Sequence, residues 1–177
     1  IDAKNHRHHT PLHLAAMQGH DRIIHILIAH GCCTNARDNS GEAPIHLAAR
    51  LGQNQAIKTL LAEGANPLVQ DRHGNTPLHT ACLAKQANTA IILVKKGVDL
   101  NVRNGYGETP LHIALKAGLI QVAESIIAHK PQLLADRIGN TPLHLAAFSR
   151  CPQIVQHLVS LSNIDQTNSL GETPLHC

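Results

Sequence analysis

The chain has 177 residues, 43% of them hydrophobic, and a formal net charge of +3, so it is long enough to bury a sizeable core. It contains one Phe, one Tyr and no Trp, which argues against a core built around aromatic anchors and leaves small aliphatic residues that suit closely packed helices. Its basic residues stand singly or in pairs, and no apolar stretch approaches the ~20 residues that span a bilayer, so we expect neither a nucleic-acid partner nor membrane insertion.

A tetrapeptide recurs along the whole chain. The letters TPLH begin at Thr10, Thr76, Thr109, Thr141 and Thr173, and APIH takes their place at Ala43. The steps between these six opening residues are 33, 33, 33, 32 and 32 residues. A period held this tightly indicates a solenoid of stacked supersecondary units. The alternative, a single globular fold that happens to repeat a tetrapeptide, is uncommon at this regularity.

Each unit is predicted to contain a turn followed by two helices. Asp or Asn five positions before the opening residue, and Gly two positions before it, predict a tight turn. Thr at the opening position can cap a helix with its hydroxyl, and the Pro after it suits the first helical turn. A second apolar-periodic run follows, such as DRIIHILIAHG at 21–31. In the first three units this run ends at Gly31, Gly64 and Gly97, where a left-handed residue costs Gly least.

The period also sets the expected boundaries of the units. In chain order they are about 5–37, 38–70, 71–103, 104–135 and 136–167, with a truncated unit at 168–177 and residues 1–4 as the tail of a preceding unit. Residues 1–177 are therefore expected to form a single array of stacked units.

The motif DxxGxTPLHLAAxxGHxxIIxxLIxxG resembles the ankyrin repeat, and the match runs from about residue 5 to the end of the chain. The period, the order of elements and the motif residues all agree with that family. The resemblance implies an all-α solenoid, an L-shaped stack of helix pairs with projecting β-hairpin-like turns. It also implies a concave face, formed by the turns and the first helices, that binds other proteins.

Two ladders of apolar residues are expected to form the core. Ala stands five residues after each opening residue of the complete units and lets neighbouring first helices approach closely, while Leu or Ile in the second helices supplies bulk. The ladders are Ala15, Ala48, Ala81, Ala114 and Ala146, and Leu27, Leu60, Leu93, Ile126 and Leu158.

Several positions depart from the repeat. Ala43 replaces Thr and loses a helix cap worth on the order of 1 kcal/mol. Other residues replace Gly: His8 in the first turn, Lys85 and Arg150 between helices, and Lys130 and Ser162 after the second helix. Because a left-handed conformation strains residues other than Gly, we expect the first turn to be strained or differently shaped and the loops after residues 129 and 160 to be rebuilt.

The motif aligns six histidines that could be a metal or catalytic ladder: His13, His46, His79, His112, His144 and His176. Zinc needs ligand atoms about 2.0–2.1 Å from one ion, whereas equivalent residues of stacked helices lie roughly 8–10 Å apart and point the same way. As the third helical residue, His takes the place of Glu in a capping box, where it can bond to the cap and to the neighbouring turn. We therefore interpret these histidines as architecture.

The remaining His and Cys residues give weaker signals. HRHH at 6–9 and His30 beside Cys32 and Cys33 could bind a transition metal, but neither has a standard ligand spacing, so solvent-facing turn residues are the better interpretation. Cys82 is predicted to be a buried hydrophobe. Nothing indicates nucleophilic Cys–His chemistry, so we predict no enzyme activity, cofactor, metal or small-molecule substrate. Five cysteines without a CxxC pair fit an intracellular protein of the cytoplasm and/or nucleus.

The rarest side chains mark the predicted partner surface. The resemblance places partner contacts in the turn residues that flank the Gly and at the two positions after LHLAA, and the only Met, Tyr and Phe of the chain fall there. Such side chains are enriched at interfaces; their exclusion from a core of small residues is the alternative. Basic and apolar neighbours predict a mildly basic concave groove for an acidic-hydrophobic segment. The predicted partner-binding residues are Met17, Arg50, Leu51, Arg72, Tyr106, Lys116, Arg137 and Phe148.

Two asparagines carry a smaller hypothesis. Asn35 and Asn101 each follow a Leu by eight residues, Leu27 and Leu93. By resemblance, this looks like the context in which asparagine hydroxylase modifies ankyrin repeats. Unmodified turn asparagines are the alternative, and the better one.

Two functions of different classes remain open from the sequence. The first is a monomeric, non-enzymatic scaffold that binds a partner protein through its concave face. The second is the targeting module of a larger enzyme or secreted effector whose catalytic domain lies outside residues 1–177. Because repeats of this kind serve many pathways, the fold does not choose between them.

Overall fold

The computed structural model describes residues 1–149 and 151–177, so Arg150, one of the predicted replacements of Gly, lies outside the described residues. The chain divides into two units, Ile1–Val98 and Asp99–Cys177. We call them unit 1 and unit 2 and describe each by itself.

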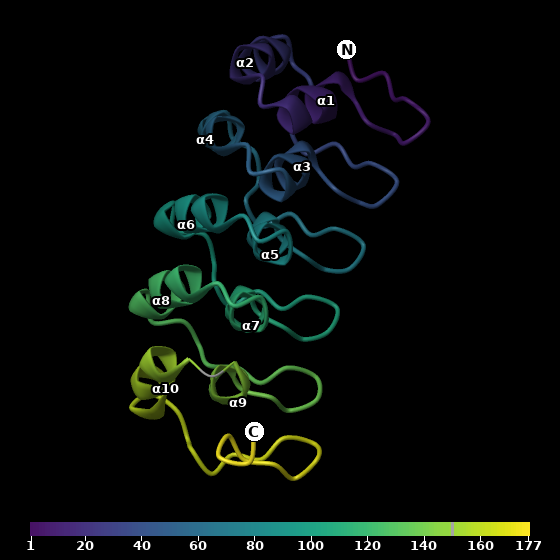
Figure 1. Cartoon of the computed structure of the whole chain (residues 1–177). Coiled ribbons are helices and arrows are strands. Elements are labelled where there is room, and N and C mark those ends of the chain that lie inside the picture. The colour runs from purple at the N-terminus through teal and green to yellow at the C-terminus, as the bar shows by residue number, and fades with distance from the viewer. Residues whose placement is uncertain (150) are drawn as a thin grey trace. The chain divides into compact units, whose positions relative to one another are not determined.

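Unit 1 contains three helix pairs (Figure 1). They are α1 (Pro11–Gln18) with α2 (Asp21–Ala29), α3 (Pro44–Arg50) with α4 (Asn54–Ala62), and α5 (Pro77–Leu83) with α6 (Ala87–Lys95). The first helices pack in the order α1, α3, α5, and the second helices in the order α2, α4, α6. Each pair therefore packs against the next pair, as the repeat predicts.

The described residues of unit 2 form two helix pairs in the same arrangement (Figure 1). They are α7 (Pro110–Lys116) with α8 (Ile120–Ala128), and α9 (Pro142–Phe148) with α10 (Pro152–Val159). Helix α7 packs against α9, and α8 against α10. A turn at 168–172 follows the last helix. In the part of the chain that the structure describes, all regular elements are helices, so the predicted all-α class is confirmed.

The predicted breaks between helices are confirmed by backbone conformation. Gly31, Gly64 and Gly97 after the second helices have φ values of +82°, +81° and +73°. Residues that replace Gly keep the same left-handed conformation: φ is +61° at His8, +56° at Lys85 and +50° at Lys130. The repeat geometry is thus retained at these positions at the expense of local backbone strain. Ser162 has no positive φ, so the loop after α10 departs from the pattern.

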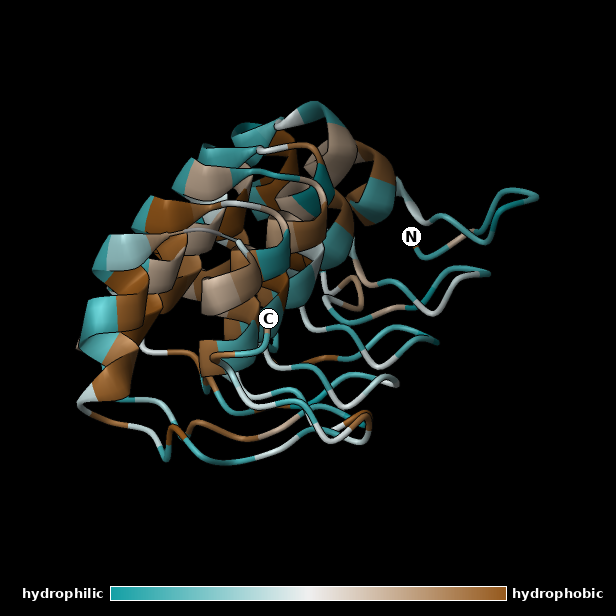
Figure 2. Ribbon diagram, turned by 60° about the horizontal axis from the view of Figure 1, so that its bottom comes forward, coloured by the Kyte–Doolittle hydropathy of each residue, from teal (hydrophilic) through white to brown (hydrophobic). Residues whose placement is uncertain are grey.

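The core consists of the two predicted ladders, with one exception. The five alanines of the first ladder are buried, and so are Leu60, Leu93, Ile126 and Leu158 of the second. Leu27 is only partly buried, because α1 and α2 pack against α3 and α4 on one side and are open to solvent on the other. Cys82 is fully buried, as predicted, and burial raises its pKa to about 12. In Figure 2 the hydrophobic residues lie mainly on the helices, while the turns are mostly hydrophilic.

Candidate functional site

The projecting turns are built on one Asp or Asn each. Its side-chain Oδ1 accepts the backbone N–H groups of the residues two and four positions later, at 2.8–3.0 Å. Five turns carry Gly three positions after the Asp or Asn; the first carries His8 and makes the same backbone hydrogen bonds, so its shape is the common one. The residues that begin the turns are Asn5, Asp38, Asp71, Asn104, Asp136 and Asn168.

Neighbouring turns within a unit are joined by backbone hydrogen bonds. In unit 1 the carbonyl of Ser40 accepts the N–H of Arg72 at 3.1 Å, and in unit 2 the carbonyl of Tyr106 accepts the N–H of Arg137 at 3.2 Å. The Ile138 carbonyl likewise accepts the N–H of Ser169 at 2.9 Å. These bonds hold the turns in register, so residues at one turn position form a row across each unit.

The motif histidines join each first helix to the next turn. In unit 1, His46 Nδ1 accepts the N–H of Ala43 at 3.1 Å, and Nε2 lies 3.0 Å from the carbonyl oxygen of Asn75. In unit 2, His112 Nδ1 accepts the N–H of Thr109 at 3.1 Å, and Nε2 donates to the backbone carbonyl oxygen of Asn140 at 3.1 Å. A ring that accepts at Nδ1 and donates at Nε2 is neutral. The architectural interpretation is therefore confirmed for these rings.

The helix cap takes the predicted form of a capping box. At Thr109 the backbone N–H donates to Nδ1 of His112 at 3.1 Å, and the Thr109 hydroxyl lies 2.8 Å from the same ring nitrogen. Ala43 therefore loses a contact with the ring, while the bond from its own N–H to His46 remains.

Burial keeps these rings neutral. Burial lowers the pKa of His13 to about 4, and it lowers the pKa of His46 and of His112 below the ordinary value. Across the described part of the chain, no group of three His, Cys, Asp or Glu side chains is placed to hold a metal ion.

The predicted partner-binding residues of unit 1 do not all present free side chains. Leu51 is 48% exposed, Arg72 is exposed and Met17 is partly exposed. Arg50 instead forms an ion pair with the nearly buried Glu42. The positive charge of Arg50 is therefore largely neutralised by Glu42 of the same chain.

Unit 2 carries the most exposed of the predicted residues. Phe148 is 76% exposed and Tyr106 is 65% exposed. Arg137 is exposed and forms no ion pair with any residue that the structure describes. Lys116 is held by two carboxylates, with Nζ 2.5 Å from Glu108 Oε1 and 4.0 Å from Asp136 Oδ2.

The ion pair also affects Glu108. Burial alone would raise the pKa of Glu108, but hydrogen bonds from Lys116 and Asn104 and the charge of Lys116 bring it below the ordinary value. Like Arg50, Lys116 therefore serves mainly to neutralise a carboxylate of its own unit.

One row of turn residues differs sharply between the units. At the position three residues before the opening residue, unit 1 has Arg7, Ser40 and His73, whereas unit 2 has Tyr106, Ile138 and Leu170. The three unit 2 side chains are 57–78% exposed. The partner-binding set predicted from the sequence omits Ile138 and Leu170, although an apolar residue at a solvent-facing turn position is a signal that could have identified them.

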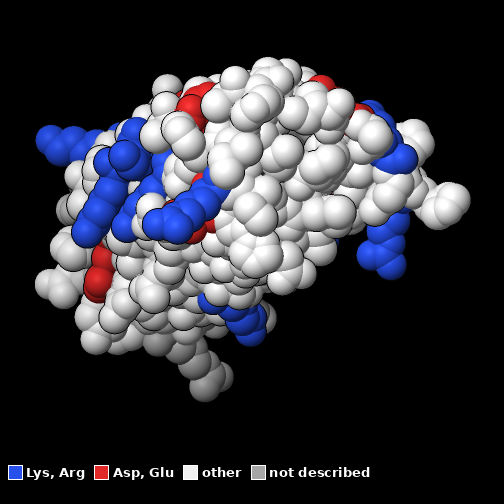
Figure 3. Space-filling view, turned by 90° about the horizontal axis from the view of Figure 1, so that it is seen from above, with Lys and Arg blue, Asp and Glu red and all other residues white. Residues whose placement is uncertain are grey.

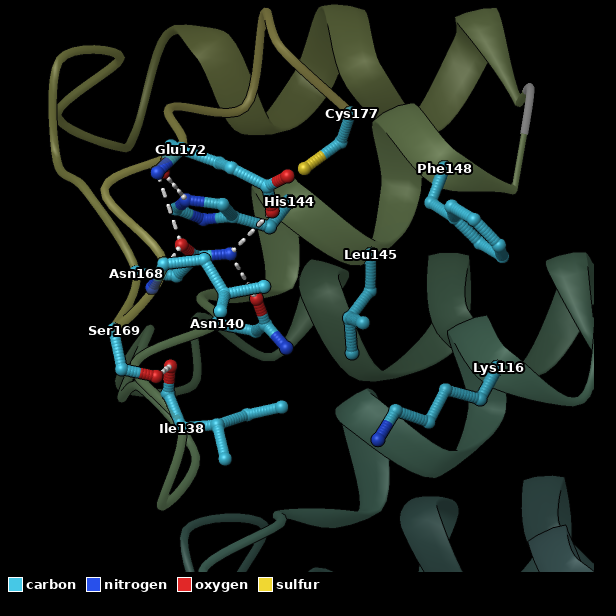
Figure 4. Close-up of a pocket in the computed structure, with 11 residues that line it drawn as sticks. Lys116, Ile138, Asn140, His144, Leu145, Phe148, Asn168, Ser169, Glu172 and Cys177 are labelled. Carbon is cyan, nitrogen blue, oxygen red and sulfur yellow. Dashed lines mark hydrogen bonds between the residues drawn. The ribbon is translucent and has the colours of Figure 1, made fainter.

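A hollow of 480 Å³ lies beside this row in unit 2. Ile138 and Leu170 of the turns, Leu145 and Phe148 of α9, and Lys116 of α7 supply side chains to its lining. Figure 4 shows Ile138, Leu145, Phe148 and Lys116 around the open space, with the polar residues gathered on another side. A second hollow of 460 Å³ shares Lys116 and Ile138 with the first and is lined as well by Tyr106, Glu108, Asp136 and Arg137.

The two asparagines of the hydroxylation hypothesis lie at equivalent positions in the two units. Asn35 Oδ1 accepts the N–H of Asn66 at 2.9 Å, and Asn101 Oδ1 accepts the N–H of Gln132 at 2.7 Å. Both side chains thus tie one loop to the loop of the following repeat. Their modification stays a prediction.

Charge is distributed in separate groups. On the face in Figure 3, Lys and Arg side chains stand in several clusters with Asp and Glu among them, separated by wide uncharged areas. This agrees with the basic residues of the sequence, which do not run together. None of the described helices is both long and apolar enough to cross a membrane.

Comparison with known families gives three matches. The family described as "Ankyrin repeats (3 copies)" matches residues 1–71, "Ankyrin repeats (many copies)" matches 60–114, and "Ankyrin repeat" matches 138–169. No curated protein matches the chain. The three family matches agree with the repeat period and with the helix pairs and turns described above.

Proposed function

We propose, because this chain belongs to the ankyrin-repeat family, that it is a scaffold that binds a partner protein through the face formed by its turns and first helices. Ankyrin repeats are generally protein–protein interaction modules, and proteins made of them are typically non-enzymatic. The observation that carries the proposal is the exposure of Tyr106 and Phe148 on this face. Large aromatic side chains are enriched at interfaces and dominate their energetics.

The corresponding face of unit 1, formed by its own turns and first helices, would contribute Met17, Leu51 and Arg72. Arg72 and Arg137 occupy the same turn position in their units, and each side-chain stem lies over the Gly of the preceding turn, Gly41 or Gly107. The base of each side chain thus packs against the preceding turn. Arg50 and Lys116 would contribute mainly their aliphatic stems, because their charges are paired.

The partner surface is proposed to be acidic and apolar. The exposed apolar side chains Tyr106 and Ile138 line one hollow with Arg137, and neither Arg137 nor Arg72 has an ion pair among the described residues. Complementary charge gives specificity and faster association. We propose that the chain acts as a monomer. The five cysteines are free thiols, which supports a reducing compartment, the cytoplasm and/or nucleus.

Affinity capture with a matched pair of variants tests this function. The face variant carries Leu51→Ser, Tyr106→Ser, Phe148→Ser and Arg72→Gln, and it leaves Arg50 in place because its loss would leave Glu42 buried and unpaired. The control variant carries Ile26→Ser, Val159→Ser, Leu161→Ser and Arg22→Gln on exposed positions of the second helices and their ends.

The expected result is that the wild type and the control variant capture the same partner and the face variant does not. Far-UV circular dichroism should show equal helix content for all three proteins. Capture that survives in the face variant, or that is lost only in the control variant, contradicts the proposal.

A further inference from the structure

Several polar groups that line the apolar hollow of unit 2 are hydrogen-bonded within the unit. Asn168 Nδ2 donates to Asn140 Oδ1 and to Glu172 Oε2, each at 3.0 Å. His144 Nε2 lies 3.1 Å from the Glu172 carbonyl oxygen, and Ser169 Oγ donates to the Ile138 carbonyl at 2.6 Å (Figure 4). These bonds hold the polar side of the hollow in place and occupy the groups that make them.

Four apolar side chains, Ile138, Leu145, Phe148 and Leu170, also line the hollow, together with Lys116 and Cys177. Phe148 and Leu170 are 76% and 78% exposed, and they stand on different elements, helix α9 and the turn at 168–172. Leu145 is almost fully buried between them at the base. Water against these side chains would be released when an apolar group fills the hollow, which favours binding. The volume of 480 Å³ falls in the range of pockets that enclose organic groups.

Beside the hollow, one cation is left without a carboxylate partner among the described residues, although the side chain of Glu172 also lines the hollow. In the adjoining hollow, Glu108 and Asp136 are both near Lys116, and Asp136 Oδ1 also accepts two backbone N–H groups of its own turn. Arg137 forms no ion pair with the described residues, and it directly precedes Ile138, which borders both hollows. A partner carboxylate close to the apolar group would form an ion pair with Arg137.

We propose that the apolar hollow of unit 2 binds one large apolar side chain from a segment of a partner protein, and that an acidic residue within a few positions of it pairs with Arg137. This inference rests on the proposed function and makes it narrower, since it assigns the specificity to unit 2. The matching rows of unit 1 carry polar side chains, Arg7, Ser40 and His73, and do not supply the same recognition.

Selection of short random peptides displayed on phage, with the full chain as the target, provides the probes. The expected outcome is enrichment of peptides in which Leu, Met, Phe or Trp lies within a few residues of Asp or Glu. An enriched peptide, labelled with fluorescein, is then titrated with the protein by fluorescence anisotropy. Its apolar residue is changed to Ser in one derivative, and its acidic residue is changed to Lys in another.

Variants of unit 2 and matched variants of unit 1 locate the site. Phe148→Ser and Leu170→Ser should each lower the affinity for the peptide by about tenfold, because one apolar contact is lost. Arg137→Gln should weaken it by about two- to fivefold, less so at high salt. Ile26→Ser and Arg22→Gln, at exposed positions on helix α2 of unit 1, are the matched changes and should leave the affinity unchanged. Arg137→Glu should prefer the peptide with Lys in place of its acidic residue.

Other outcomes overturn the inference. Enrichment of peptides without the acidic-apolar pattern would contradict it. A loss of peptide binding in the unit 1 variants alone would also contradict it. So would an Arg137→Glu variant that shows no preference for the peptide with Lys in place of its acidic residue. The absence of any enriched peptide also overturns it. The proposed function fails separately, when the face variant described above still captures the partner. A partner that depends on Leu51 and Arg72 would leave the function standing and remove the assignment to unit 2.

Discussion

At the scale of single residues, the motif histidine is the most informative side chain. His13 Nδ1 accepts the N–H of Thr10 at 3.1 Å, and Nε2 lies 3.1 Å from the carbonyl oxygen of Glu42. Protonation would place a hydrogen on Nδ1, where it would face the N–H of Thr10 and remove that bond. Protonation would therefore release the ring from the start of its own helix, while Nε2 could still donate to the next turn.

This arrangement predicts that the protein becomes less stable as the pH falls below about 6.5. The pKa of His13 is lowered to about 4, and those of His46 and His112 are also lowered, so the unfolded chain takes up protons that the folded chain does not. The contribution of these rings to the free energy of unfolding is complete above the pKa that they have in the unfolded chain. It falls as the pH drops toward the pKa that they have in the folded protein. For His13 alone the loss between pH 7 and pH 5 is on the order of 2 kcal/mol.

Urea denaturation at pH 7.5, 6.5, 5.5 and 5.0 measures this loss, in a range above most carboxyl titrations. His73→Gln is the control, because His73 is exposed and its removal should not change the dependence. A stability that stays constant from pH 7.5 to pH 5.0 would show that the buried rings do not titrate as their contacts require.

At the scale of elements, each turn depends on a side-chain oxygen rather than on a charge. Asp71 Oδ1 accepts the N–H groups of His73 and Asn75 at 2.8 Å, and Asn104 makes the equivalent bonds in unit 2. Asp71→Asn should therefore keep nearly the full free energy of unfolding. Asp71→Ala should lose about 1–3 kcal/mol, because two N–H groups lose their acceptor.

Thermal and urea denaturation of the two Asp71 variants at pH 7.5 provide the comparison. Equal destabilisation by Asn and Ala would mean that the negative charge matters more than the acceptor. Hydrogen exchange of the His73 and Asn75 amides should rise in the Ala variant and stay near the wild-type rate in the Asn variant.

At two glycines of unit 2, the cost of a left-handed backbone conformation can be measured apart from the cost of disturbing the packing between turns. Gly107 and Gly118 have φ values of +76° and +70°. A Cβ on Gly107 would lie 2.9 Å from the backbone nitrogen of Arg137, whereas a Cβ on Gly118 would meet nothing within 4 Å. Gly118→Ala should cost about 1–2 kcal/mol from the left-handed conformation alone, and Gly107→Ala should cost more because the next turn must move.

Differential scanning calorimetry of the two Ala variants compares the losses directly. A smaller loss at Gly107 than at Gly118 would contradict the close stacking of the turns. Because the clash involves backbone, repacking of the Arg137 side chain should not rescue Gly107→Ala, and Gly107→Ala combined with Arg137→Ala should remain less stable than Gly118→Ala.

At the scale of the whole molecule, periodic features of the sequence predicted the architecture well. The Ala ladder, the helix ends at Gly31, Gly64 and Gly97 and the turns built on Asp or Asn all appear where the repeat places them. Each of these features depends on residues that are near one another in sequence or recur at one spacing. Local chemistry is sufficient to identify them.

Features that depend on how different elements meet were harder to predict. The pairing of Arg50 with Glu42 uses side chains on a helix and on the turn before it. The apolar hollow needs two turns and α9 to bring Ile138, Leu170 and Leu145 together. The exposure of Leu27 depends on what covers α2, which no local pattern contains. The rarity of aromatic residues in this chain identified Tyr106 and Phe148. It could not identify the aliphatic residues beside them, because Leu and Ile are common throughout the sequence.

The number of helix pairs in each unit predicts how the units behave when they are separated. Residues 1–98 contain three complete pairs with a core that includes Ile57, Leu60 and Leu93, whereas residues 99–177 contain two. Repeat proteins generally need about three repeats for independent stability, because each interface between pairs must offset the entropy of ordering the chain. The fragment 1–98 should therefore keep its helical circular dichroism and unfold cooperatively on heating.

The fragment 99–177 should show weaker helical signal and a broad or absent transition at the same concentration, since it has one interface between complete pairs instead of two. The full chain under identical conditions is the reference. A fragment 99–177 that unfolds cooperatively at a higher temperature than 1–98 would mean that the loops around Lys130 and Ser162 stabilise unit 2 beyond what its helix pairs supply. In that case the apolar hollow could be studied in unit 2 alone, with the same peptides and the same Phe148 and Leu170 variants.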